Sequence, residues 1–187
     1  MAEIVTTEFK HRGWSSFLLA TIRLPDGGTI TRAIEDHGNA VAVLPYDPVR
    51  RMAILVRQFR APALYAAQQR DFLEAVAGVI DAGEDAESCA RRETAEEAGL
   101  ELRAIERVAR AWAMPGVSTE QMDLFLGEYS QADRISAGGG IDDESIEVLE
   151  MPLAELAAMT DSGALKDMKA LVLVQTLRLR RPELFAG

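Results

Sequence analysis

The sequence has little cysteine, no excess of positive charge and no long hydrophobic run. Its single cysteine, Cys89, cannot form an intrachain disulfide or a thiolate metal site, so we expect it to be a small buried residue. The 20 Lys and Arg residues face 30 Asp and Glu residues, giving a net charge of −10. No basic block resembles a nucleic-acid footprint, which excludes nucleic acid as the expected partner. A small phosphorylated ligand remains compatible, provided that local cations neutralise it.

The chain also lacks the features of a membrane or secreted protein. No run approaches the roughly 18 apolar residues of a membrane span, and the first residues, MAEIVTTEFK, contain neither a basic nor an apolar signal region. We therefore expect a cytoplasmic protein with no membrane partner. With 187 residues, 48% hydrophobic and 27% charged, the chain is typical of a soluble globular protein with one core and a smaller appendage.

The pattern of apolar and turn residues predicts mostly strands in the first half of the chain. Residues 3–36 read as a small antiparallel sheet with a turn at Asp26-Gly27-Gly28. Further strands are expected at 40–44, 52–56, 71–77, 101–113, 121–129 and 146–151. A loop containing Pro62 and a flexible glycine loop at 137–140 are expected between them.

Helices are expected in three places. Residues 85–98 are all compatible with a helix, and Gly99 follows as a C′ residue. Two more helices are expected at 152–160 and 164–180. Strands mixed with a few helices, without regular βαβ alternation, predict an α+β fold in which a mixed sheet lies between helices.

Carboxylates are concentrated on the predicted helix 85–98. Glu93, Glu96 and Glu97 are three or four residues apart, so they project from one face. Such close like charges cost stability, and Arg91 and Arg92 offset only part of them. A solvated acidic face explains the spacing, but so does a site for hard divalent metals such as Mg²⁺ or Mn²⁺, which take oxygen ligands. The other face is small and can pack closely on a sheet.

The spacing around these carboxylates decides between the two explanations. The segment matches G-x5-E-x7-R-E-U-x-E-E-x-G-U at every fixed position, namely Gly78, Glu84, Arg92, Glu93, Glu96, Glu97 and Gly99, with Leu100 at the final U and only Thr94 not strictly aliphatic. A chance match to seven fixed letters is on the order of one in a hundred million per starting position. This pattern is the Nudix box, and the chain resembles the Nudix hydrolases.

This resemblance implies a fold and a set of roles. The fold would be the Nudix fold, with residues 39–187 as the hydrolase domain and residues 1–38 as an N-terminal antiparallel sheet used for dimerisation. It implies Glu93, Glu97 and Glu96 as metal ligands, together with the carbonyl of Ala77. Glu84 and Arg92 would hold the shape of the diphosphate cradle.

Four further stretches resemble the branch that hydrolyses nucleoside diphosphate sugars. They are VRQFR ending at Arg60, MPGVSTE with Pro115 and Glu120, AGGGIDDESIEV with Asp143 and Glu144, and the segment from Gly163 to Lys169. The resemblance implies substrate contacts for five residues, namely Arg60, Lys169, Pro115, Glu120 and Asp143. It also implies that Trp14 stacks on the base. Glu144 follows a glycine-rich loop that can move over a bound substrate, so it is the candidate for a general base or a further metal ligand, with Glu96 as the next candidate for the base.

The sequence also departs from this branch, and each accessory residue has a structural alternative. Met114 stands where relatives have serine, and Ala33 stands where relatives have a glutamate tied to base recognition. Arg60 could be a surface ion-pair partner, and Lys169 a solvated helix residue. Glu120 and Asp143 could satisfy loop amides, and Trp14 could belong to a core or an interface.

The expected function is Mg²⁺-dependent hydrolysis of a pyrophosphate bond by a homodimer, with a nucleotide sugar as substrate. GDP-mannose, yielding GMP and mannose 1-phosphate, is the first expectation. ADP-ribose, yielding AMP and ribose 5-phosphate, is the alternative. A non-catalytic Nudix-like module that only binds its ligand is the alternative from another class.

Overall fold

The computed structural model describes residues 1–141 and 145–186, which form two compact units. The first unit comprises Met1–Ala40 and Ala111–Met122, and the second comprises Val41–Arg110 and Asp123–Gly187. The segment 111–122 thus groups with the N-terminal residues rather than with its neighbours in sequence. The assignment of residues 1–38 as a separate dimerisation domain stays a prediction.

The first unit is built on a three-stranded antiparallel sheet. Its strands, in the order β1-β2-β3, are Glu3–Arg12, Ser16–Arg23 and Thr29–Asp36. The turn between β2 and β3 is fixed by Asp26, whose carboxylate accepts the amide of Gly28 at 2.9 Å. Every residue of the edge strand β1 is exposed. The small antiparallel sheet expected from the sequence is confirmed.

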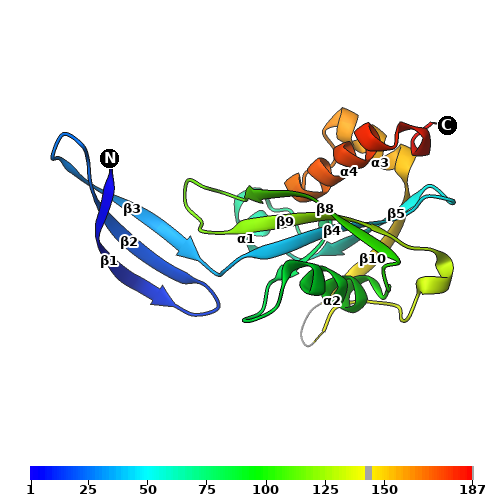
Figure 1. Cartoon of the computed structure of the whole chain (residues 1–187), viewed down its shortest axis with the longest axis horizontal. Coiled ribbons are helices and arrows are strands. Elements are labelled where there is room, and N and C mark those ends of the chain that lie inside the picture. The colour runs from blue at the N-terminus through cyan, green and yellow to red at the C-terminus, as the bar shows by residue number, and fades with distance from the viewer. Residues whose placement is uncertain (142–144, 187) are drawn as a thin grey trace. The chain divides into compact units, whose positions relative to one another are not determined.

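The second unit contains most of a seven-stranded sheet whose main path runs β10-β5-β4-β9-β8 (Figure 1). Of the remaining two strands, β6 pairs with β5 and β7 pairs with β4. The bounds are β4 Ala40–Asp47, β5 Met52–Gln58, β6 Phe72–Glu74, β7 Val76–Val79, β8 Ala104–Trp112, β9 Gln121–Glu128 and β10 Glu147–Pro152. The central strand β4 is buried along its whole length, as its continuous apolar run predicts.

Helices lie on both faces of this sheet. They are α1 Ala61–Ala67, α2 Ala86–Ala98, α3 Leu153–Ser162 and α4 Met168–Arg180, with short 3-10 turns η1 Gln131–Asp133 and η2 Pro182–Leu184. Figure 1 shows α2 below the sheet and α3 and α4 above it. The predicted α+β fold, a mixed sheet between helices, is confirmed. Within the described residues, none of these helices is both long and apolar enough to cross a membrane.

Three local predictions are corrected by the structure. The segment around Pro62 is helix α1 and not a loop, because proline is tolerated at the first positions of a helix. The predicted strand 71–77 is two short strands that pair with different neighbours. The last helix begins at Met168 and not at residue 164, because Asp167 accepts the amides of Lys169 and Ala170 and caps it there.

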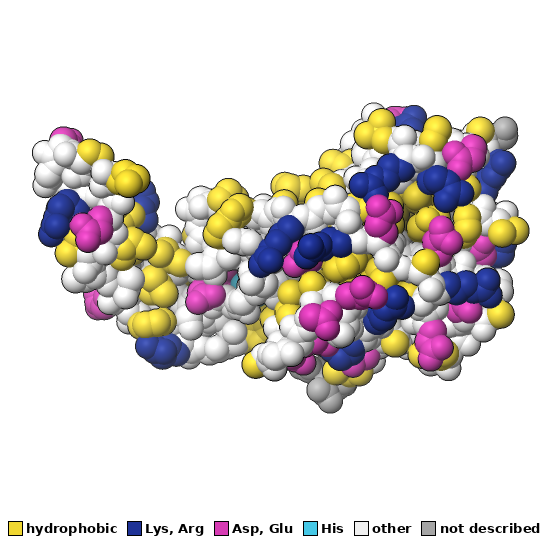
Figure 2. Space-filling model, in the orientation of Figure 1, with side chains coloured by type: hydrophobic (Ala, Val, Ile, Leu, Met, Phe, Trp, Pro, Cys, Tyr) yellow, Lys and Arg dark blue, Asp and Glu magenta, His cyan; other side chains and the backbone are white. Residues whose placement is uncertain are grey.

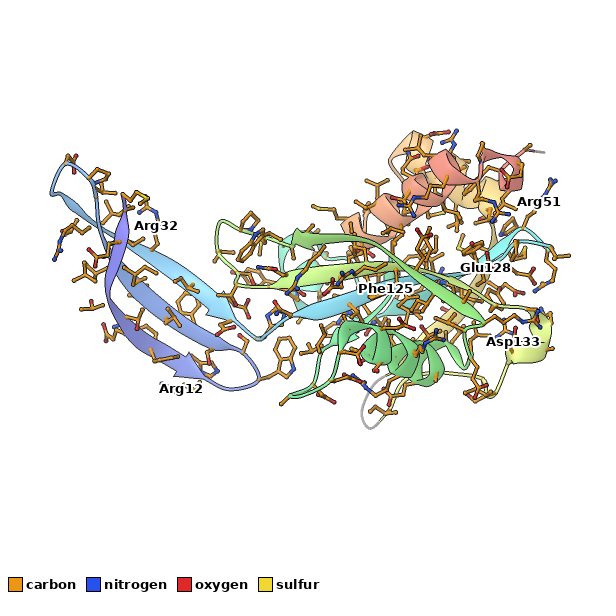
Figure 3. The ribbon with its side chains drawn as sticks, viewed as in Figure 1. Arg12, Arg32, Arg51, Phe125, Glu128 and Asp133 are labelled. Atoms are coloured by element: carbon orange, nitrogen blue, oxygen red, sulfur yellow. The ribbon has the colours of Figure 1, made fainter. Side chains whose placement is uncertain are left out.

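Helix α2 forms where the sequence predicts it and packs its small face on the sheet. Asp85 caps it by accepting two amides, and Gly99 ends it with a left-handed φ of 66°. Cys89, Ala90 and Ala98 are fully buried and share a core cluster with Phe125, which is labelled on β9 in Figure 3. Small side chains let the helix backbone approach the sheet, so the carboxylates on its other faces are held on a rigid element.

Cys89 is the buried residue that the sequence predicts. Burial, reinforced by the charge of Glu84, raises the pKa of its thiol to about 12. At neutral pH Cys89 is therefore a protonated thiol and part of the core.

Candidate active site

Arg92 lies at the centre of the carboxylates that the box brings together. Its Nε and Nη2 each donate to Glu84 at 3.0 Å, and its Nη1 donates to Glu93 at 2.7 Å and to Glu96 at 3.0 Å. The hydrogen bond between Arg92 and Glu84 lowers the pKa of Glu84 and raises that of Arg92. One guanidinium therefore holds three box glutamates together and supports the predicted role of Arg92 and Glu84 in the shape of the site.

Glu97 is the most buried carboxylate of the box, with 3% of the residue exposed. Its Oε2 accepts the backbone amide of Ala77 at 3.1 Å. This hydrogen bond joins α2 to strand β7 and brings together two of the residues predicted to surround the metal.

Sterics explain why the first position of the box, residue 78, is a glycine. A Cβ atom built on Gly78 would overlap the carboxylate of Glu93. Any other residue at this position would displace either strand β7 or the Glu93 side chain. Gly78 thus leaves the space that a predicted metal ligand occupies.

The glycines at 138–140 close the end of α2 and do not form the free loop expected from the sequence. The amides of Gly139 and Gly140 donate to the last-turn carbonyls of Glu97 and Glu96 at 2.9 and 3.1 Å. A Cβ atom on Gly138, whose φ is 71°, would overlap the Glu97 carbonyl. The glycine run is therefore explained by close packing on the helix that carries the carboxylates.

The carboxylate set fits a hard divalent cation, although Arg92 fills its centre here. No group of three or more His, Cys, Asp or Glu side chains is arranged around a common point within the part of the chain that the structure describes. Glu93, Glu96 and Glu97 nevertheless offer oxygen atoms from adjacent turns of one helix, and Gly78 makes room for the first of them. Oxygen-only donors with excess negative charge match the preferences of Mg²⁺ and Mn²⁺.

Arg60 and Lys169, both predicted to contact the substrate, meet at one buried carboxylate in the second unit. Arg60 donates to Glu74 at 2.6 Å, and Lys169 donates to the same side chain at 3.1 Å. Arg60 is therefore not paired with a surface carboxylate, and Lys169, whose side chain is 21% exposed, is not a solvated helix residue. Glu74 was not predicted, although a single carboxylate within the apolar run FLEAVAG was a signal for it.

Three more predicted binding residues, Trp14, Pro115 and Glu120, lie in the first unit. Trp14 is 80% exposed and stacks on His37, with ring centroids 4.9 Å apart and planes 17° apart. It is therefore not a core residue. Pro115 lies in a turn in which the amides of Val117 and Ser118 donate to the Met114 carbonyl at 3.0 and 2.9 Å.

His37, to which the sequence assigns no role, is held between two carboxylates. Its Nδ1 lies 2.8 Å from Glu35 Oε1, and its Nε2 lies 3.5 Å from Glu120 Oε1. Burial opposes the charged imidazole, but the hydrogen bond to Glu35 and the charges of Glu35 and Glu120 outweigh it and raise the pKa of His37. Glu120 thus faces a histidine, which the loop pattern alone could not indicate, because these partners are distant in sequence.

Two predicted site residues, Asp143 and Glu144, lie outside the described residues. Their assigned roles, a substrate contact and a general base or metal ligand, stay proposals.

Comparison with known proteins decides the family. The family profile of the NUDIX domain matches residues 36–171, which is well over half of the chain and includes the whole box. The chain belongs to the Nudix family. The predicted Nudix fold and the predicted enzyme class, a hydrolase of pyrophosphate bonds, are confirmed. Divalent metals are general cofactors of Nudix hydrolases.

Relatives within the Nudix family align with about four fifths of this chain. The chain is 40% identical to the GDP-mannose pyrophosphatase of Cronobacter sakazakii over 150 residues, covering 80% of this chain and 78% of that protein. It is 38% identical to the GDP-mannose pyrophosphatase of Klebsiella pneumoniae over 157 residues, covering 82% and 78%. The fold matches a crystal structure described as an ADP compounds hydrolase, with a TM-score of 0.79, 18% identity and coverage of 97% and 95%.

Proposed function

We propose that this Nudix hydrolase cleaves the pyrophosphate bond of nucleoside diphosphate sugars, with GDP-mannose as its preferred substrate and GMP and mannose 1-phosphate as products. The observation that carries the proposal is the similarity, at 34–40% identity, to GDP-mannose pyrophosphatases of several bacteria. ADP-ribose is the second candidate, favoured by the fold match to an ADP compounds hydrolase. Ala33, which stands where the resemblance places a glutamate tied to base recognition, counts against a preference for guanine.

Residues of the second unit hold the metal in this proposal. In this proposal Glu93, Glu96 and Glu97, with the Ala77 carbonyl, hold Mg²⁺, and Mn²⁺ is the alternative ion. Such ions, when bound, neutralise diphosphate oxygens and lower the pKa of a coordinated water. Arg92 keeps the three carboxylates of its network in place.

Two further roles complete the proposed mechanism. Arg60 and Lys169 bind the negative diphosphate, which orients the scissile bond. Glu144 accepts the proton of the attacking water, and Glu96 is the next candidate for this base. The cytoplasmic location expected from the sequence stays a prediction.

The first unit supplies the proposed base-binding surface. Trp14 is exposed, and His37 stacks on its ring. An exposed indole held by a stacked ring is suited to stack on a purine. In the proposal Pro115 and Glu120 shape the surrounding loop, and Asp143 contacts the substrate. A Trp14→Ala variant with an unchanged KM for GDP-mannose would remove Trp14 from this role.

A substrate panel tests the proposed function. With Mg²⁺ present, we expect GDP-mannose to give the highest kcat/KM among GDP-mannose, ADP-ribose, other nucleotide sugars, dinucleoside polyphosphates and nucleoside triphosphates. Products are separated by chromatography, because release of a nucleoside monophosphate and a sugar phosphate marks cleavage of the central bond. A nucleoside triphosphate that is turned over better than every nucleotide sugar would overturn the assignment. Turnover of none of them would favour the non-catalytic binding module.

The proposal includes a homodimer formed through the first unit. All of β1 is exposed, including the apolar residues Ile4, Val5 and Phe9, and Figure 2 shows exposed hydrophobic side chains interspersed with charged ones on this three-stranded sheet. An exposed edge strand with apolar side chains is a surface that proteins cover. Light scattering at micromolar concentration should give about twice the chain mass of 20.4 kDa. A fully active monomer would contradict the proposal.

A further inference from the structure

Glu74 is a buried carboxylate that the proposed mechanism does not use. It ends strand β6, where it pairs with Val56 of β5, and only 2% of the residue is exposed. Its two oxygens accept Nε and Nη2 of Arg60 at 2.6 and 3.1 Å. This two-point hydrogen bond fixes the plane of the guanidinium as well as its position.

A second cation reaches the same carboxylate from another element. Lys169, in the first turn of α4, donates from Nζ to Glu74 Oε2 at 3.1 Å and to Asp167 Oδ1 at 2.8 Å. Asp167 also accepts the amide of Ala75 at 3.0 Å. Two cations that are distant in sequence therefore share the buried carboxylate of Glu74, and Lys169 is also held by the buried Asp167.

This cluster lies next to the carboxylates of the box. The backbone amide of Ala75 donates to Asp167, and that of Ala77, two residues later, donates to Glu97. The charge of Glu97 is also among the effects that raise the pKa of Arg60. Burial opposes the charged guanidinium, but the hydrogen bond and charge of Glu74 outweigh that effect. Arg60 thus stays charged within electrostatic range of the predicted metal ligands.

A buried ion pair that only supports the fold would enclose both partners, and this cluster does not. The Glu74 side chain is 3% exposed, whereas the side chains of Arg60 and Lys169 are 43% and 21% exposed. Arg60 uses Nε and Nη2 on Glu74, so this two-point contact does not involve Nη1. The carboxylate is buried beneath the cations, and the cations keep N–H groups for another anion.

We infer that Glu74 is a positioning residue that holds Arg60 and Lys169 together so that both point free N–H groups at the diphosphate of a bound nucleotide sugar. The inference rests on the proposed function, in which these two cations bind the diphosphate. Two neighbouring cations on long flexible side chains repel each other and lose rotamer freedom when they bind a ligand. A fixed carboxylate between them reduces both costs before the substrate arrives.

A cycle of substitutions separates positioning from structural support. Glu74→Gln keeps the shape but removes the charge, and we expect it to raise KM for GDP-mannose about 10–100-fold with kcat changed less than about threefold. The dissociation constant of GDP-mannose, measured by calorimetry in EDTA where no turnover occurs, should rise by a similar factor. In the background Arg60→Gln/Lys169→Gln, the same Glu74→Gln change should alter this constant less than about twofold, because its targets are gone.

Glu150 provides a matched control. This half-buried carboxylate on β10 also holds two arginines, accepting Arg50 at 2.7 and 2.8 Å and Arg134 at 3.4 Å. Its hydrogen bonds with Arg50 lower the pKa of Glu150 to about 2. Glu150→Gln removes a comparable network from the other edge of β5, so it should lower Tm and leave KM unchanged. If Glu74→Gln prevents folding, Glu74→Asp, which keeps the charge on a shorter stem, should give a smaller rise in KM.

The outcomes separate the inference from the proposed function. Equal effects of Glu74→Gln in the wild-type and Arg60→Gln/Lys169→Gln backgrounds would show a structural role and overturn the inference. An unchanged dissociation constant in the Arg60→Gln/Lys169→Gln variant would overturn it as well, whereas turnover of GDP-mannose would still stand. If the panel instead reveals another pyrophosphate substrate, the proposed function fails, and the same cycle run with that substrate decides the inference.

Discussion

Glu97→Gln is expected to lower kcat by about 10³-fold, equivalent to about 4 kcal/mol of transition-state stabilisation. Glu97 is buried, and its Oε2 accepts the Ala77 amide. A glutamine can keep that hydrogen bond through its carbonyl oxygen, so strand β7 and α2 should stay joined. What the substitution removes is the negative charge that a hard divalent cation requires.

Two measurements separate this effect from damage to the fold. Steady-state kinetics at saturating GDP-mannose and Mg²⁺ give kcat, and Mn²⁺ binding followed by electron paramagnetic resonance reports the affinity for the metal without turnover. Glu87→Gln on the same helix is the matched control, because Glu87 is exposed and pairs with Arg91 four residues later. It should change neither quantity.

The prediction for Glu97 is wrong if the variant turns over at a near-normal rate. It is also wrong if the wild-type protein hydrolyses its substrate fully in EDTA. Glu93→Gln should lower kcat as Glu97→Gln does. It should also lower the stability of the fold, because it weakens the hydrogen bond that Glu93 accepts from Arg92.

The elements that could be predicted from the sequence are those fixed by local chemistry. Helix α2 was predictable because Asp85, the small residues facing the core and Gly99 all favour the same helix. Helix α1 was missed because Pro62 favours a loop when it is judged by residue type alone, whereas its position at the start of the helix makes it compatible. The glycines at 138–140 suggested flexibility, but their partners are carbonyls of α2 that lie about 40 residues earlier in sequence.

The candidate site likewise contains residues that could be predicted from the sequence and contacts that could not. The box carboxylates could be assigned because their spacing along one helix determines which residues share a face. The partners of Arg60 and Lys169 could not, because Glu74 meets them only after β5, β6 and α4 have packed together. His37 and Glu120 likewise meet across a long stretch of sequence. Spacing predicts contacts within an element, whereas contacts between elements depend on the tertiary fold.

Arg92→Met tests whether the box needs a positive charge at its centre. Methionine keeps an unbranched apolar stem, shorter than that of arginine, and removes the hydrogen bonds to Glu84, Glu93 and Glu96. The three carboxylates then face one another without a counter-charge, so the free energy of unfolding should fall by about 2 kcal/mol in EDTA. The exposed part of the Arg92 side chain, 30%, keeps this value below that of a fully buried network. Because the carboxylates also lose their orientation, kcat/KM should fall about 10²-fold.

The dependence of this loss on Mg²⁺ identifies its cause. A cation that binds only the folded protein adds stability, and a site with more unbalanced negative charge should gain more from it. Urea unfolding in EDTA and in millimolar Mg²⁺ should therefore show the deficit of Arg92→Met shrinking when Mg²⁺ is present. Arg91→Met on the same turn is the control, because Arg91 pairs with the exposed Glu87 and should cost less than about 1 kcal/mol in both media. A deficit that is equal with and without Mg²⁺ would mean that Arg92 only packs, and that the carboxylates around it do not form a cation site.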